Sequence, residues 1–219
     1  MQTLAQNGNG NAAYIDTIQE AQKTLVDEAS STLFPIAKDV KIQVEFNPAT
    51  VSEYRLIGYE TRLLNREDFN NDKVDAGEIG AGHSVTALYE ITPAGSDARL
   101  IEPSRYGTTE AESTVNVHAG EYAFLRLRYK QPDSDTSTLI ERPITGADAV
   151  EPDSEARFAA AVAGFGQLLR GGRYTGDFSY DDVISLASGA RGEDAFGYRT
   201  EFIRLARLAK TAAALERQQ

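Results

Sequence analysis

The stretch Val40-Lys41-Ile42-Gln43-Val44-Glu45-Phe46 decides the fold class, because apolar and polar residues alternate along its whole length. Such alternation is typical of a β-strand with one buried face, and Asn47-Pro48 is a signal that ends the strand. Further stretches with strand character follow, separated by turns rich in Gly, Pro and Asn: residues 51–60, 84–92, 114–117, 122–130 and 138–144, the last weakened by Pro143. This succession predicts an antiparallel β-sandwich-like domain over residues 39–147.

Helical patterns flank the strands on both sides. Before them, a turn at 7–11 and a short apolar run at 12–15 lead to an amphipathic helix predicted from Thr17 to Ser30. After them, residues 152–219 are predicted to be helical, with one helix capped by Asp153 and ended by Gly171-Gly172, one starting at Ser179 or Asp181, and one from Tyr198 to Glu216. We expect the last helix to turn Phe202, Leu205, Ala209 and Ala212 inward. The predicted fold class is therefore α+β.

Composition narrows the classes of function. The 219 residues include 33 acidic and 22 basic side chains, a formal net charge of −11, so nucleic acid and anionic membrane surfaces are poor partners. The chain has no cysteine, which excludes disulfides, thiolate metal sites and cysteine nucleophiles. No stretch approaches the roughly 20 apolar residues that a membrane-spanning helix needs, and the polar start lacks a signal peptide. If the chain is complete as given, we expect it in the cytoplasm.

Several longer phrases resemble one known family. They lie at residues 8–17, 36–48, 54–60 and 75–90, and in Ala190-Arg191-Gly192-Glu193-Asp194-Ala195-Phe196-Gly197-Tyr198-Arg199. In this wording the chain resembles the C-terminal end of bacterial von Willebrand factor A (vWA) proteins of the YfbK-like group. The resemblance implies that residues 1–38 are the last strand and helix of a vWA domain, followed by a C-terminal region to which no function is attached. It also implies a location in the bacterial cell envelope or periplasm.

The resemblance implies a magnesium site that this chain lacks. A vWA domain carries a metal-ion-dependent adhesion site written D-x-S-x-S, whose oxygens bind Mg²⁺ and leave one position for a partner's carboxylate. That motif does not occur here, because Asp133-Ser134-Asp135-Thr136-Ser137 has an aspartate where the first serine should stand. We therefore expect no cofactor in this chain, with the magnesium site upstream of Met1 in a longer protein.

The most conspicuous polar cluster lies at residues 68–78. Asp68, Asn70 and Asp72 occupy the first, third and fifth positions of a calcium-binding loop, and calcium takes several oxygen ligands from one such loop. Against this, Lys73 stands where that loop has glycine, and Ile79 where it has glutamate. The alternative interpretation is a polar loop between strands, stabilised by Asp and Asn turn chemistry.

The two histidines and a basic helix complete the candidates. His83 and His118 each stand near a glycine at the edge of a predicted strand, and could serve as an acid–base or metal pair only if the fold brought them together. Arg199, Arg204 and Arg207 make the last helix locally basic. Such a run is usually a solvated face, but it could also bind an acidic partner or another domain of the same polypeptide.

The prediction of function follows from the family resemblance and from the absence of a recognisable catalytic or cofactor-binding motif in the sequence. We expect a non-catalytic protein-interaction or structural module that supports a vWA domain or binds a protein partner. The alternative is a calcium- or small-ligand-binding module using the loop at 68–78. An enzyme that depends on His83 or His118 is the third possibility.

Overall fold

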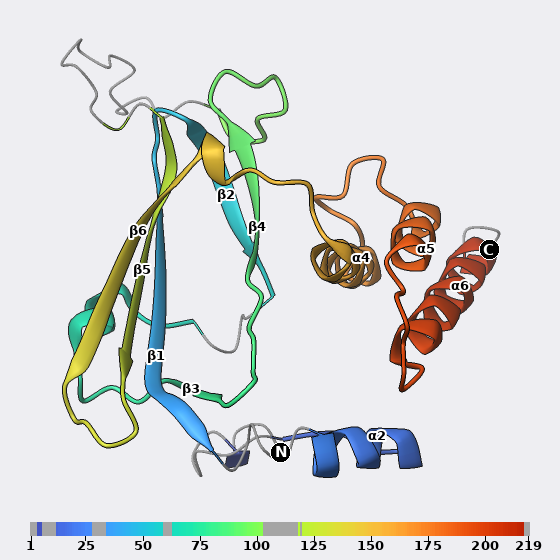
Figure 1. The fold of residues 1–219 in the computed structure, drawn as a ribbon. Helices are drawn as coiled ribbons and strands as arrows, with labels where there is room; N and C mark the ends of the chain where they lie inside the picture. Colours follow the sequence, from blue (N-terminus) through green and yellow to red (C-terminus); the bar gives the residue numbers. More distant parts are fainter. Residues whose placement is uncertain are drawn as a thin grey trace. The chain divides into compact units, whose positions relative to one another are not determined.

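The chain divides into two compact units, Met1–Ala149 and Val150–Gln219. A computed structural model describes residues 4–5, 12–27, 34–58, 63–102, 118 and 120–216 (Figure 1). The turn predicted at 7–11 and the strand predicted at 114–117 lie outside these residues. The first unit carries the strands and the second carries three helices, which confirms the α+β class.

The strands form two antiparallel sheets. A four-stranded sheet has the order β3-β1-β5-β6, and a two-stranded sheet pairs β2 with β4. The bounds are β1 Pro35–Phe46, β2 Val51–Ile57, β3 Gly77–Gly80, β4 Leu88–Pro93, β5 Glu121–Lys130 and β6 Ser137–Thr145. Each alternating stretch that lies within the described residues is thus found in a strand. The strand predicted from Ser84 begins only at Leu88.

Three cross-strand rows make up one face of the four-stranded sheet, because side chains of paired residues point to the same side. The rows join β1, β5 and β6: Phe46, Ala123 and Ile144; then Val44, Leu125 and Arg142; then Ile42, Leu127 and Ile140. We call these the covered, middle and open rows of the apolar face. The Phe46 ring stacks on Tyr54 of β2 at 4.3 Å between centroids and meets Tyr89 of β4 edge-on at 5.3 Å. The two-stranded sheet therefore packs over the covered row.

The opposite face of the same sheet is basic. Lys41, Arg128 and Lys130 lie on it, under a loop that includes the short 3-10 helix η2 (Arg66–Asn70). Lys41 is only 3% exposed, whereas Ile42 beside it is 45% exposed. From alternation alone, the apolar side of β1 is expected to be buried and the polar side exposed. At Lys41 and Ile42 the opposite is found, because the loop covers the polar side.

The helix predicted from Thr17 to Ser30 is found as far as residue 27, and residues 28–30 lie outside the described part of the chain. Helix α2 (Ile18–Gln22) is followed directly by one π-helical stretch, η1 (Lys23–Asp27). Thr17 and Glu20 exchange hydrogen bonds between side chain and backbone at its start, a reciprocal pattern typical of helix N-termini. Another short 3-10 helix, η3 (Gly146–Asp148), follows β6.

The second unit packs α4 (Ser154–Leu169), α5 (Tyr180–Gly189) and α6 (Tyr198–Glu216) around aromatic side chains. The Asp153 carboxylate accepts from the backbone N–H of Ala156, and Ser179 forms a capping box with Asp182, so both predicted caps are found. The core is built on small or branched side chains beside phenylalanines: Ala161, Phe165, Val183, Ala187, Ile203 and Ala206, packed by Phe158 and Phe202. No helix among the described residues is long and apolar enough to cross a membrane.

The inward face predicted for α6 is wrong at two positions. Ile203 and Ala206 are buried, whereas Leu205 is 52% exposed and Ala212 is exposed. The sequence of α6 has apolar residues on two sides of the helix, and periodicity alone does not say which side meets α4 and α5. The phenylalanines of α4 decide it, because Phe158 and Phe165 both pack edge-on against Phe202 at 5.3 Å.

Candidate functional site

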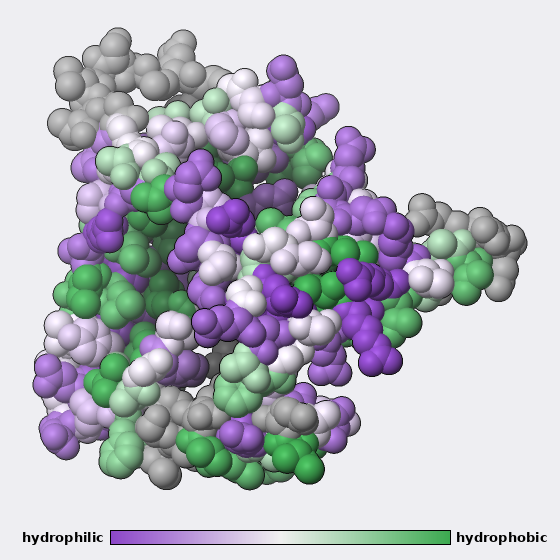
Figure 2. Space-filling model, turned by 45° about the vertical axis from the view of Figure 1, so that its right-hand side comes forward, coloured by the Kyte–Doolittle hydropathy of each residue, from purple (hydrophilic) through white to green (hydrophobic). Residues whose placement is uncertain are grey.

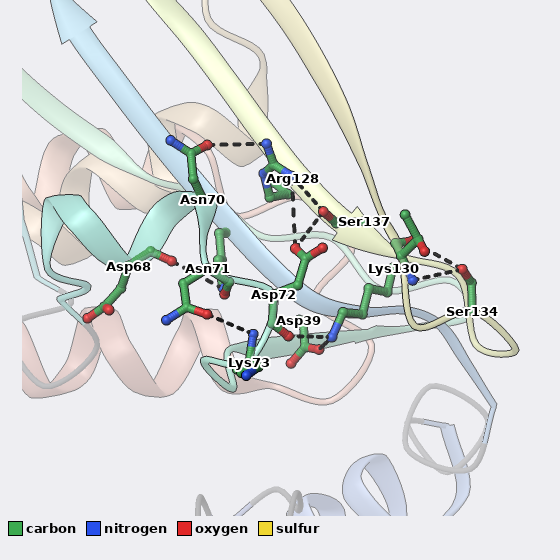
Figure 3. A network of polar contacts seen from close by, with 12 residues as sticks. Asp39, Asp68, Asn70, Asn71, Asp72, Lys73, Arg128, Lys130, Ser134 and Ser137 are labelled. Carbon is green, nitrogen blue, oxygen red and sulfur yellow. Dashed lines mark hydrogen bonds and ion pairs between the residues drawn. The ribbon is translucent and has the colours of Figure 1, made fainter.

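A network of charged side chains fastens the loop at 68–78 to the basic face of the sheet (Figure 3). The Lys41 ammonium donates to the carbonyl oxygens of Asp68 (3.3 Å) and Asn71. Asp68 lies in η2 and Asn71 directly follows it, and their carbonyl oxygens also accept from the backbone N–H groups of Asn71 and Val74. Lys41 therefore serves as a buried clamp that holds the loop by its backbone.

A second lysine links the loop to both strands beneath it. Lys130 of β5 donates 2.7 Å hydrogen bonds to the Asp39 carboxylate of β1 and to the carbonyl oxygen of Asp72. Burial alone would raise the pKa of Asp39, but the hydrogen bond from Lys130 and another from the Ala76 N–H more than offset it, and the pKa is lowered. The pKa of Lys130 is raised, first by its hydrogen bond to Asp39. Both groups are therefore held charged.

The three predicted calcium ligands point to different partners. The Asp68 carboxylate accepts from the Asn65 amide, the Asn70 side-chain oxygen accepts from Arg128, and the Asp72 carboxylate accepts from the Ser137 hydroxyl. The hydrogen bond from Ser137 is the main reason why the pKa of Asp72 is lowered. Figure 3 shows the Asp68 carboxylate directed away from Asn70 and Asp72.

In this arrangement the loop is held by cations of the protein itself. Within the described residues no group of three or more histidine, aspartate or glutamate side chains is placed to hold a metal ion. A calcium ion at Asp68, Asn70 and Asp72 would have to draw these oxygens from their present partners. Calcium binding stays a prediction, and the melting temperature in excess calcium against that in a chelator tests it.

The two histidines lie at opposite ends of the first unit. His83 follows β3, whose Gly80 pairs with Pro35 at the start of β1. His118 lies at the other end of β1, where its carbonyl oxygen accepts from Asn47 and its Nδ1 is 2.9 Å from Glu121. The twelve residues of β1 span about 40 Å at 3.3 Å per residue. The fold therefore does not bring the histidines together as a pair.

The three arginines of the basic helix have different environments. Arg199 donates to Glu155 and to the Ala190 carbonyl oxygen, and its guanidinium lies 4.8 Å from the centre of the Phe158 ring. It therefore ties α6 to α4 within the unit. Arg204 and Arg207 are exposed on the side of α6 away from the core and remain available to a partner.

The open row of the apolar face is a surface that no sequence motif indicates. Ile42 is 45% and Ile140 is 50% exposed, and Leu127 between them is half-buried. Hydrophobic side chains reach the surface at several places in Figure 2, among polar ones. The sequence signal for this surface is the apolar alternation along the two long strands β1 and β5. The strands β2 and β4, which pack on the same face, are shorter and cover only part of it.

Comparisons with known proteins agree on one family. The model of the family described as "Uncharacterized protein YfbK, C-terminal" matches residues 31–212. The chain is 48% identical over 209 residues to the protein named "Uncharacterized protein YfbK" of Escherichia coli (strain K12). That match covers 95% of this chain and 36% of the relative, so the chain spans little more than a third of the relative's length. No solved structure matches the chain.

Proposed function

The chain belongs to the family of YfbK C-terminal regions, and from this we propose that it is a non-catalytic interaction module that docks against the upstream part of a longer polypeptide. The observation that carries the proposal is the open row of the apolar face. In a sheet with one apolar face, that face is normally packed against a second layer. Here the second layer packs over the covered row, where Phe46 meets Tyr54 and Tyr89.

The chemistry of the open row favours a protein surface as its occupant. Ile42, Leu127 and Ile140 form a continuous branched aliphatic strip across three strands. Covering the exposed halves of the two isoleucines would contribute about 1 kcal/mol each. Such a strip offers no directional polar group that would select a small ligand. An apolar layer from another domain fits it best.

The part of the E. coli relative that lies outside the match is the candidate partner. Almost two thirds of the E. coli relative lies outside the matched region. We propose that this upstream part contains a vWA domain with the magnesium-binding motif that the present chain lacks. A docked C-terminal module would then fix the orientation of that domain. Because the two parts belong to one chain, even a weak contact would be populated through its high effective concentration.

The experiment mixes the purified chain with the upstream part of the E. coli relative and measures binding by calorimetry. Ile140→Lys places a charge on the open row and should weaken binding at least about tenfold, equivalent to about 1.4 kcal/mol. Leu139→Lys is the matched control, because Leu139 neighbours Ile140 on β6, is 41% exposed and faces the opposite side of the sheet.

The relative's own C-terminal region serves as the positive control and as a competitor. Loss of binding with Ile140→Lys alone supports the proposal. The proposal is wrong if both lysine variants weaken binding equally, or if neither C-terminal region binds at about millimolar concentration, the effective concentration that a short linker provides.

A further inference from the structure

The segment before β1 carries an apolar stripe that the rest of the first unit leaves exposed. Helix α2 and η1 together span ten residues. On them Ile18 is 84%, Leu25 is 67% and Val26 is 66% exposed. Ile18 and Leu25 stand seven residues apart, a spacing that puts two side chains on one side of a helix, and Val26 adjoins Leu25. We call these three residues the leading stripe.

The sequence marks where this helix begins but does not by itself stabilise it. Thr17 and Glu20 exchange hydrogen bonds at its start, and the Ala21 amide donates to the Thr17 carbonyl oxygen at 3.1 Å. An isolated helix shorter than about 12–15 residues is only marginally stable in water, and most helices in proteins depend on the packing of an apolar face. A helix with a defined start and an exposed stripe therefore needs a packing partner.

The comparisons with known proteins indicate which polypeptide this partner is. The match to the E. coli relative covers 209 residues and leaves only about ten of the 219 unmatched, so residues 12–27 lie within it. The model of the YfbK C-terminal region, in contrast, begins at residue 31. The segment is thus shared with the relative but precedes its C-terminal region. It is covalently joined to whatever domain comes before, and any other partner would compete with this attached surface.

We propose that residues 12–27 fold as the last element of the domain that precedes the YfbK C-terminal region, with the leading stripe packed against that domain. Tyr14 and Ile15, just before the helix, are 82% and 41% exposed and extend the apolar surface. The module itself begins at β1, where Pro35 pairs with Gly80 of β3. This contact is separate from the open row, so it goes beyond the proposed function and does not rest on it.

Hydrogen exchange in two proteins tests the proposal: the free 219-residue chain, and a chimera in which the chain replaces the matched region of the E. coli relative. The Ala21 amide reports on the helix, because it donates within its first turn. In the free chain its protection should be less than about tenfold, since so short a helix opens readily by itself. In the chimera its protection should rise at least about a hundredfold, because three apolar side chains leave water and each accounts for roughly a factor of ten.

Two substitutions in the chimera test the role of the leading stripe. Leu25→Glu should lower the protection of the Ala21 amide at least about tenfold, because it places a charge against an apolar surface. Lys23→Glu is the matched control, since it introduces the same side chain two residues away, on the opposite side of the helix. Ile140→Lys should leave the Ala21 amide unaltered, so that docking through the open row and packing of the leading stripe can each fail without the other.

Removal of residues 1–27 from the free chain completes the test. Its melting temperature should stay the same, because the leading stripe is exposed there. A lower melting temperature would overturn the proposal by placing the segment in the module itself. Equal protection of the Ala21 amide in the free chain and in the chimera would also overturn it, as would equal losses of protection with Leu25→Glu and Lys23→Glu.

Discussion

Replacing Lys41 by methionine tests whether the clamp under the loop is a source of stability. The ammonium of Lys41 is buried and donates to two backbone carbonyl oxygens at the end of η2. Hydrogen bonds to charged groups contribute about 1.5–3 kcal/mol each, and the bond of 3.3 Å to Asp68 is the weaker of the two. Methionine keeps the apolar stem in place and removes the cost of burying a charge.

The balance of these effects is a loss of about 2–3 kcal/mol, a large part of the 5–15 kcal/mol that stabilises a typical domain. Hydrogen exchange is the suitable assay, because it reports on the loop and β1 separately from the helical unit. Protection of the Val74 amide, which donates to Asn71, should fall about 30- to 150-fold.

Lys210→Met is the matched control for this change. Its ammonium pairs with the carboxylate of Asp181, and both side chains are about half or more exposed. An exposed ion pair of this kind contributes at most about 1 kcal/mol. If Lys41→Met lowers stability no more than Lys210→Met does, the role given to the buried clamp is wrong.

Two further predictions concern the ion pair and the helix packing. The folded pKa of Asp39 is lowered and that of Lys130 is raised, so their stabilisation is full between about pH 4 and 10, and is lost as pH falls or rises through the two folded values. Asp39→Asn, which suits the positive φ of 50° at that position, should flatten both the acid limb and the alkaline limb of stability, because the hydrogen bond to Asp39 is the main cause of the raised pKa of Lys130. Urea midpoints from pH 3 to 11 that match the wild type would contradict this. In α4, Gly164→Ala should destabilise by about 1–3 kcal/mol, because its Cβ would lie 2.4 Å from the Phe178 ring. Gly166→Ala in the same helix meets no atom within 4 Å and should stabilise by about 0.5–1 kcal/mol, so equal melting shifts of the two variants would refute the packing.

Much of the fold follows from patterns that act locally. Alternation identified β1 and β5, and a carboxylate or hydroxyl at the right position identified the starts of α4 and α5. These signals depend on neighbours within a turn or a few residues, and the sequence contains them fully.

The sequence does not show which side of a strand or helix is covered by residues that are distant along the chain. From its place in the alternation, Lys41 is predicted to face solvent, but the loop from residue 68 folds over it. Leu205 is predicted to be buried, but Phe158 and Phe165 determine that another side of α6 turns inward. For the same reason, the calcium spacing of Asp68, Asn70 and Asp72 gave no hint that Asn65, Arg128 and Ser137 would engage their oxygens.

The most direct test of the interaction module measures how accessible the open row is in the longer protein. Ile140→Cys and Leu139→Cys give single thiols on opposite faces of β6, because the chain has no other cysteine. Their labelling rates are compared in the free chain and in the chain fused behind the upstream part of the E. coli relative. We predict that labelling at position 140 slows at least about tenfold in the fusion, while position 139 keeps its rate, as expected when a contact of about 1.4 kcal/mol or more covers one face. Equal rates at position 140 in the free chain and in the fusion would contradict the account.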